Sequence, residues 1–206
     1  MIAIVDYGVG NLFSLKSSFS ALGVEAIVTK DKETLKTADG IILPGVGAFG
    51  DAAKKLKDSG LSQTLIDLAK SGKPLMGICL GMQLLFEKGY EYGEHDGLGL
   101  IKGSVKPIKD VIPDNLKIPH IGWNALKLKG ENPLFKYIKN GDCVYFVHSF
   151  YGTDCEENII ATAEYGKDLT AAVADKNVFG CQFHPEKSGK VGLEILKAFS
   201  EMRAEK

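Results

Sequence analysis

The stretch KPLMGICLGMQLLF, residues 73–86, joins a short apolar run that ends at Cys79 to a helical pattern that begins at once. This order predicts a strand over residues 73–78, a sharp turn at the cysteine and a helix over the rest of the stretch. Gly77 and Gly81 stand two residues on either side of Cys79. A turn this tight needs glycine where a Cβ would clash with the flanking backbone. The stretch therefore predicts a nucleophile elbow.

A cysteine at such an elbow projects from the end of a sheet and sits at a helix N-terminus. The partial positive charge of the helix terminus favours the thiolate over the thiol. The alternative is a small buried hydrophobic side chain at a strand end, because free cysteine is among the most buried residue types. The elbow spacing favours the nucleophile, and other motifs must supply the context.

The composition places limits on the class of protein. The 206 residues suffice for one packed core, so we expect a single domain over residues 1–206. The 25 basic and 26 acidic residues form no long block of one sign, which argues against nucleic acid or a membrane as a partner. With no spanning apolar run and no signal-peptide pattern, we expect a cytoplasmic protein. Four scattered cysteines without a CxxC pair predict reduced thiols. The four histidines lack the close spacing of known metal sites, so we expect no metal, and we also expect no cofactor.

Apolar runs and amphipathic segments alternate in the first half of the chain. We expect strands at residues 2–5, 26–29, 40–43 and 73–78, and helices at 11–22 and 51–71. Unbroken apolar strands between amphipathic helices indicate a parallel sheet covered on both faces. After residue 98 we expect strands at 105–108, 118–128, 143–150, 159–165, 170–174 and 178–183, and a closing helix at 191–202. Strands linked by turns suggest antiparallel additions to the same sheet or a small flanking sheet.

His184 is the candidate base for the cysteine. It ends the apolar run 178–183 and is followed by Pro185 and Glu186. The residue before a proline is held extended, and positions i and i+2 of an extended chain point the same way. We therefore expect Glu186 to orient the His184 ring, which would take the proton of Cys79. A satisfied histidine at a strand end is the alternative, since a bare HPE tripeptide is a weak signal.

The loop PGVGAFG, residues 44–50, is the candidate oxyanion hole. Its glycines leave backbone N–H groups unshielded beside the N-terminus of an expected helix. Gly45, Gly47 and Gly50 also match the dinucleotide fingerprint G-x-G-x-x-G. That fingerprint calls for an acidic residue about 20 residues on, at the end of the next strand, where this chain has Cys79. A nucleotide site is therefore the weaker interpretation.

Three motifs in order, GICLGMQ at residues 77–83, FHPE at 183–186 and the 44–50 loop, resemble the class I, triad-type glutamine amidotransferases over the entire chain. DYGVGN at 6–11 and PHIGWN at 119–124 narrow the resemblance to the glutaminase subunits of imidazole glycerol phosphate synthases. The resemblance implies a flavodoxin-like three-layer α/β/α fold with a central, mostly parallel sheet. It also implies hydrolysis of glutamine, with ammonia channelled to a TIM-barrel cyclase partner that forms imidazole glycerol phosphate and AICAR in histidine biosynthesis.

The same resemblance implies roles for individual residues. Cys79, His184 and Glu186 match the catalytic triad. The other implied roles are glutamine binding for Gly47, Gln83, Glu91, Ser149 and Phe150, oxyanion donation for the backbone of Val46, Gly47 and Leu80, and partner contact for Asn11, Trp123, Asn124 and Lys187. Phe150 stands where tyrosine is expected, which is harmless if only its main chain is used. Ordinary packing is the alternative for Trp123.

Three other interpretations belong to different classes. A glutaminase for another synthase, such as one that makes pyridoxal phosphate or aminodeoxychorismate, is disfavoured by the 6–11 and 119–124 stretches. A cysteine peptidase or chaperone-like hydrolase of related fold would not need Gln83. A catalytically silent binding subunit would not need a complete set of cysteine, histidine and glutamate.

Overall fold

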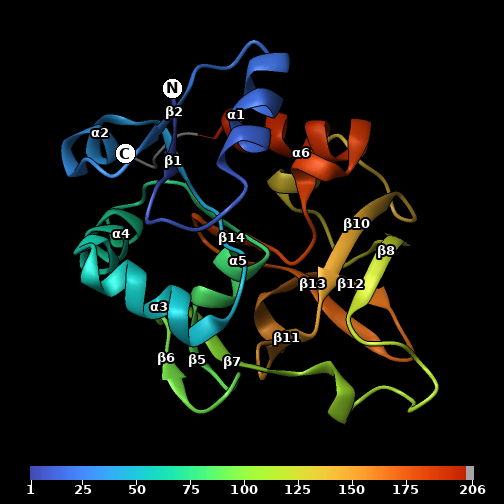
Figure 1. Ribbon diagram of the computed structural model, residues 1–206. Coiled ribbons are helices and arrows are strands. Elements are labelled where there is room, and N and C mark those ends of the chain that lie inside the picture. The colour runs from blue at the N-terminus through green and yellow to red at the C-terminus, as the bar shows by residue number, and fades with distance from the viewer. Residues whose placement is uncertain (203–206) are drawn as a thin grey trace.

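Residues 1–202 of the chain are described in a computed structural model (Figure 1). The helices are α1 Leu12–Ala21, α2 Lys32–Thr37, α3 Phe49–Asp58, α4 Leu61–Lys70, α5 Leu80–Leu84 and α6 Gly189–Ser200. The strands are β1 Ile2–Val5, β2 Ala26–Thr29, β3 Gly40–Leu43, β4 Leu75–Ile78, β5 Phe86–Gly89, β6 His95–Asp96, β7 Ile101–Pro107, β8 His120–Ala125, β9 Lys127–Leu128, β10 Cys143–His148, β11 Phe150–Thr153, β12 Ile159–Glu164, β13 Asp168–Asp175 and β14 Val178–Cys181. Four short 3-10 helices lie between them, among them η4 Pro185–Lys187.

The large sheet has the strand order β2-β1-β3-β4-β14-β13-β12-β9. Neighbours from β2 to β14 pair in parallel, whereas β13, β12 and β9 pair antiparallel. Two smaller sheets, β10-β8 and β11-β7-β5-β6, are built from the middle of the chain. The prediction of a flavodoxin-like, mostly parallel sheet with antiparallel additions in the C-terminal half is confirmed, and the additions extend the main sheet as well as flanking it.

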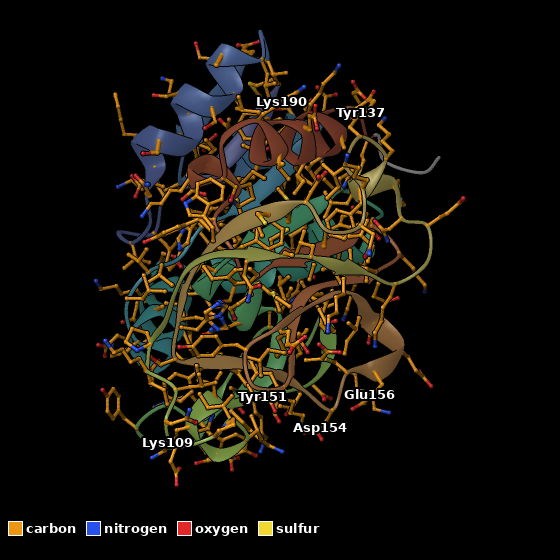
Figure 2. The ribbon with its side chains drawn as sticks, turned by 90° about the vertical axis from the view of Figure 1, so that its right-hand side faces the viewer. Lys109, Tyr137, Tyr151, Asp154, Glu156 and Lys190 are labelled. Atoms are coloured by element: carbon orange, nitrogen blue, oxygen red, sulfur yellow. The ribbon has the colours of Figure 1, made fainter. Side chains whose placement is uncertain are left out.

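Helices cover both faces of the large sheet. Alternate residues of β1 show the two sides: Ala3 and Val5 pack with residues of α3 and α4, whereas Ile2 and Ile4 pack with residues of α1 and α6. Figure 1 shows α1 and α6, from opposite ends of the sequence, side by side on one face. In the turned view of Figure 2, Lys190 of α6 lies at the opposite end of the molecule from Tyr151 of β11. The arrangement is three-layered.

Two expected helices end earlier than the sequence pattern indicates. The single helix expected over residues 51–71 is wrong, because Gly60 takes a left-handed φ of +70° and separates α3 from α4. Glycine adopts this conformation without steric penalty and so ends helices readily. The helix expected as far as Phe86 is also wrong. The carbonyls of Leu84 and Leu85 accept from the backbone of residues 98–101, and Phe86 opens β5.

The strand expected over residues 143–150 is divided at Ser149. Its first part, β10, pairs with β8, and its second part, β11, pairs with β7. The Ser149 carbonyl accepts from Ile108 N at 2.9 Å, which holds the crossing between the two sheets. Because each half finds a different partner strand, the apolar pattern alone could not show the break. The division leaves residues 147–150 at the wall of the candidate site.

Candidate active site

Three neighbouring parallel strands bring the sequence motifs together. β4 lies between β3 and β14, and the chain leaves these three strands at the 44–50 loop, at Cys79 and toward His184. The carboxyl ends of parallel strands meet at one edge of a sheet, where ligands bind in such folds. The Cys79 N–H donates to the carbonyl of Cys181 at 2.7 Å, which fixes the cysteine against β14.

The turn at Cys79 has the close packing expected of an elbow. Cys79 itself has a positive φ of 55°, rare for a residue with a side chain. A Cβ on Gly77 would lie 2.4 Å from the Gly81 carbonyl oxygen, and one on Gly81 would lie 1.8 Å from the Leu43 oxygen. Both glycines are therefore required by space, because no real Cβ approaches backbone so closely.

The imidazole of His184 is held between a carboxylate and the cysteine. Its Nδ1 lies 2.8 Å from Glu186 Oε1, and the two side chains are 4% and 1% exposed. The expected i and i+2 geometry is wrong in detail, because Glu186 lies in the 3-10 turn η4 and not in an extended strand. Burial by itself would lower the pKa of His184, but hydrogen bonding and charge from Cys79 and Glu186 raise it to about 9. These two neighbours favour the protonated form of the ring.

A pocket of about 390 Å³ opens over this group. Of the triad, Cys79 and His184 line this pocket. Every residue expected to bind glutamine or to donate to an oxyanion lines it as well. The pocket is lined by Val46, Gly47, Cys79, Leu80, Gln83, Glu91, Pro119, Val147, His148, Ser149, Phe150, His184 and Lys187. The structure thus places in one cavity residues that are up to 141 positions apart in the chain, from Val46 to Lys187.

The 44–50 loop leaves backbone donors free at the pocket wall. Within the described residues 1–202, the N–H groups of Val46 and Gly47 donate to no acceptor in the chain. Leu80 opens α5, so its N–H has no acceptor one turn back in the helix. Glu91 closes the far end of the loop, where its Oε2 accepts from Phe49 N at 2.7 Å. Val46, Gly47 and Leu80 line the same pocket as Cys79.

The 6–11 stretch packs against Pro44, the first residue of this loop. The Tyr7 hydroxyl donates to the carbonyl of Pro44 at 2.8 Å, and burial raises the pKa of this phenol, with a further contribution from the charge of Cys79. A Cβ on Gly10 would lie 2.8 Å from Pro44 Cβ. One of the two stretches that narrowed the family resemblance therefore contacts the candidate oxyanion loop.

Gln182 is a site residue that sequence reasoning missed. It is fully buried, and its Nε2 lies 3.8 Å from Cys79 Sγ while its Oε1 accepts from Gln83 Nε2 at 3.0 Å. Gln83 Nε2 also donates to the Phe150 carbonyl at 3.3 Å. The sequence does contain one indication of its role. Gln182 is a polar residue within the apolar run 178–183, and a buried polar group needs a hydrogen-bond partner.

A pair of buried histidines forms the support of the Phe150 wall. His148 Nδ1 donates to the Phe150 carbonyl at 2.8 Å, so its Nε2 must accept from His120 Nδ1, 3.0 Å away. Burial lowers the pKa of His148 to about 4 and also lowers the pKa of His120. Both rings are neutral at pH 7, as this direction of donation requires. No local pattern indicates the pairing, because it depends on the register of β8 with β10.

The expected partner-facing residues divide into two groups. Trp123 is 58% exposed, and its ring lies 6.2 Å from that of Tyr145, which Lys187 Nζ also approaches at 6.0 Å. Asn124 is different, because its amide donates to the Glu164 carbonyl at 2.7 Å and accepts from Ala125 N. Asn11 is half-buried at the start of α1. Trp123 and Lys187 are thus free to contact a partner, whereas the Asn124 amide is engaged within the chain.

Two other kinds of site, a metal centre and a membrane-spanning helix, are absent from the described residues. Over residues 1–202, no group of three or more histidine, cysteine, aspartate or glutamate side chains is arranged to hold a metal ion. In the same part of the chain, none of the helices has the length and apolar character needed to cross a membrane.

Comparisons with known proteins show the family of the chain. Residues 3–202 match the family model of class I glutamine amidotransferases. The chain is 50% identical over 201 residues to the imidazole glycerol phosphate synthase subunit HisH of Lactococcus lactis, covering 97% of this chain and 98% of the relative. It is 48% identical over 208 residues to HisH of Bacillus subtilis, covering 100% and 98%.

Solved structures show the same fold at lower identity. The PurLQS structure from Thermotoga maritima matches with a TM-score of 0.74 and 22% identity, covering 96% of each chain. A crystal structure of a glutamine amidotransferase matches with a TM-score of 0.75 and 21% identity, covering 97% of this chain and 99% of the other.

Proposed function

Because the chain belongs to the class I glutamine amidotransferases and, within them, to the family of HisH subunits of imidazole glycerol phosphate synthase, we propose that it hydrolyses glutamine through Cys79, His184 and Glu186. The observation that carries the proposal is the position of the His184 ring, with Nδ1 on Glu186 and its other nitrogen toward Cys79 at the edge where β4 and β14 end. No cofactor is needed, since nucleophile, acid and base are side chains.

The first half of the reaction makes a thioester. Cys79 Sγ attacks the side-chain carboxamide carbon of glutamine, and the proton held on His184 goes to the departing nitrogen as the C–N bond breaks. The raised pKa of His184 supports this order, because it favours a proton on the ring that can pass to the departing nitrogen. Glu186 keeps Nδ1 protonated, so that the other nitrogen exchanges the proton.

The second half releases glutamate. His184 takes a proton from water, the water oxygen attacks the thioester carbon, and the sulfur of Cys79 leaves as the thiolate. In both halves a negative charge develops on the carbonyl oxygen. The backbone N–H groups of Val46, Gly47 and Leu80 are the proposed donors to it, supported by the two free N–H groups of the loop.

The amino-acid end of glutamine is assigned to the opposite wall of the pocket. Gln83, Ser149 and Phe150 line the pocket, and so does Glu91, whose Oε2 accepts from Phe49 N. Backbone groups at residues 149–150 suit the α-carboxylate, and the carbonyl oxygen of Gln83 suits the α-ammonium. The Phe150 ring in place of tyrosine does not alter this assignment, which uses main chain.

The ammonia product is proposed to pass through a channel to a TIM-barrel cyclase subunit, with which the chain forms a heterodimer in the cytoplasm. The cyclase would use the ammonia to form imidazole glycerol phosphate and AICAR in histidine biosynthesis. Support comes from the relatives, which are named as subunits of imidazole glycerol phosphate synthase. The exposed Trp123 and the adjacent Lys187 are the proposed contacts, with Asn11 beside α1.

The proposal is tested with Cys79→Ala in the complex with the cyclase. We expect loss of glutamine-dependent product formation and retention of product formation from free ammonia, because only the nucleophile is removed. Cys143→Ala changes an exposed thiol outside the pocket and serves as the matched control. Glutamine-dependent turnover that survives Cys79→Ala would refute the triad.

A further inference from the structure

We propose that Gln182 is a positioning residue with two separable roles, one toward the sulfur of Cys79 and one toward the amide of Gln83. The first role concerns only the reactivity of the Cys79 thiol and does not require that glutamine is the substrate. The second rests on the proposed function, because it concerns recognition of the amino-acid end of glutamine. Both roles follow from the one orientation that the Gln182 amide can adopt.

That orientation is traced from a backbone carbonyl. The Phe150 oxygen can only accept, and it already accepts from His148 Nδ1, so the Gln83 atom beside it at 3.3 Å must be the amide nitrogen. The same nitrogen faces Gln182 at 3.0 Å, so that contact atom of Gln182 must be the oxygen. The Gln182 nitrogen is left pointing at Cys79 Sγ, 3.8 Å away. The reversed amides would place acceptor against acceptor.

The first role is stabilisation of the nucleophile. An N–H directed at sulfur favours the charged form of the sulfur, and hydrogen bonds to charged groups are stronger than neutral ones. Gln182 is fully buried and water cannot replace it as a donor. Its N–H therefore adds to the effect of the His184 ring, which also interacts with Cys79.

The second role is selection of the charge that Gln83 presents to the pocket. An amide nitrogen has two hydrogens, and the Gln83 nitrogen uses both, on Gln182 and on Phe150. The Gln83 oxygen accepts no hydrogen bond within residues 1–202, and Gln83 lines the pocket. A free acceptor suits an ammonium group and repels a carboxylate. Without Gln182, only the longer contact to the Phe150 carbonyl, at 3.3 Å, would hold the Gln83 amide in this orientation, and the preference would weaken.

The experiment compares two alkylating agents on the full chain at pH 7. Iodoacetamide reports the reactivity of the Cys79 thiol, because it carries no amino-acid end. 6-Diazo-5-oxo-L-norleucine carries the α-ammonium and α-carboxylate of glutamine, so the ratio of its rate to that of iodoacetamide reports recognition. Modification of Cys79 is followed by peptide mass in Gln182→Met, Gln83→Met and the double variant. Gln63→Met on the exposed side of α4 is the matched control, and thermal unfolding reports folding of each variant.

We expect Gln182→Met to slow iodoacetamide about tenfold, the effect of one hydrogen bond to a charged group, and to lower the rate ratio as well. Gln83→Met should lower the ratio and leave the iodoacetamide rate within about twofold of wild type, because the Gln182 contact to sulfur remains. The double variant should have the ratio of Gln83→Met alone, since Gln182 acts on recognition only through Gln83. Methionine keeps the volume of glutamine, so packing alone predicts no change.

Three results would overturn the proposal in part or whole. An unchanged iodoacetamide rate in folded Gln182→Met removes the first role. A double variant whose ratio falls well below that of Gln83→Met removes the second. If the wild-type chain shows no preference for the diazo analogue, the proposed glutaminase function fails and takes the second role with it, while the iodoacetamide comparison still decides the first.

Discussion

Two glycine-containing turns meet at the pocket, and they differ in how tightly they are held. The elbow after β4 has no spare room, because a Cβ on Gly81 would lie 1.8 Å from the Leu43 oxygen. The 44–50 loop after β3 is open where it reaches the pocket: Gly47 has φ +92° with nothing within 4 Å of an added Cβ, and Val46 is 44% exposed.

The nucleophile therefore lies on a rigid turn, whereas its oxyanion donors lie on a turn that can change conformation. A packed turn has a single arrangement, because any shift would displace backbone on several strands. An open loop with unpaired N–H groups can exchange between orientations of a peptide plane at small cost. We infer that the triad is fixed by folding, whereas the donors at Val46 and Gly47 can be adjusted by whatever contacts the loop.

The largest expected effects come from substitutions in the triad, which folding holds in place. By analogy with a serine-protease triad, His184→Ala should lower kcat about 10⁶-fold and Glu186→Ala about 10⁴-fold, because an orienting group contributes less than the base it orients. Neither loss should be recovered by the cyclase. Glutamate release by the complex, with circular dichroism as the folding control, measures both. Equal losses in two folded variants would contradict the assigned roles.

The next effect concerns the backbone donors of the 44–50 loop. We expect the isolated chain to be a poor glutaminase and the cyclase loaded with its nucleotide-like substrate to raise turnover at least about 10²- to 10³-fold, the value of one oxyanion donor. The physical reason is rotation of the Val46 peptide, so that its N–H points toward the developing charge. Steady-state glutamate release with and without the loaded partner tests this. A chain that is equally fast alone would show that the loop is already complete.

Stability should also distinguish the two turns. Gly81→Ala should lower the free energy of unfolding by more than about 3 kcal/mol, since the new Cβ meets backbone that cannot move aside. Gly47→Ala should cost about 1 kcal/mol, from the positive φ alone. Urea unfolding of the two variants gives both values on one scale. Similar losses in the two variants would mean that the elbow is less constrained than its packing indicates.

The sequence was sufficient for the parts of the site that follow from strand ends. Cys79, His184 and the 44–50 loop each leave a parallel strand, and because β3, β4 and β14 are neighbours their carboxyl ends meet. Apolar runs predicted those strands and the helices between them. The proximity of Glu186 to His184 was also predicted, although the structure achieves it by a 3-10 turn.

The remaining features depend on pairings between distant segments. Gln182 was missed because its partners, Cys79 and Gln83, lie about a hundred residues away. The His120 and His148 pair depends on the register of two strands in a small separate sheet. The expectation that Asn124 faces a partner did not foresee that the Glu164 carbonyl would engage its amide. Local pattern predicts elements, whereas such contacts are set by tertiary packing.

The smallest expected effect concerns the wall opposite the two turns, where His148 supports the Phe150 carbonyl. The folded-state pKa of His148, about 4, lies below its ordinary value, so the unfolded chain binds the proton first. Its contribution to stability is complete above pH 6.5 and is lost as the pH falls toward 4.

Between pH 7 and pH 5 this titration should remove about 2 kcal/mol from the free energy of unfolding. His148→Phe keeps an aromatic ring of similar size and cannot titrate, so its stability should fall by about 2 kcal/mol less over the same interval, although it starts from a lower value. Urea unfolding at the two pH values measures the difference. The titrations of the carboxylates are common to both proteins and cancel to first order, whereas His120 loses its acceptor in the variant, so the comparison is repeated in a His120→Phe background. If wild type and variant lose the same stability, His148 is not held neutral by the fold, and the hydrogen-bond direction from His120 to Phe150 must be reassigned.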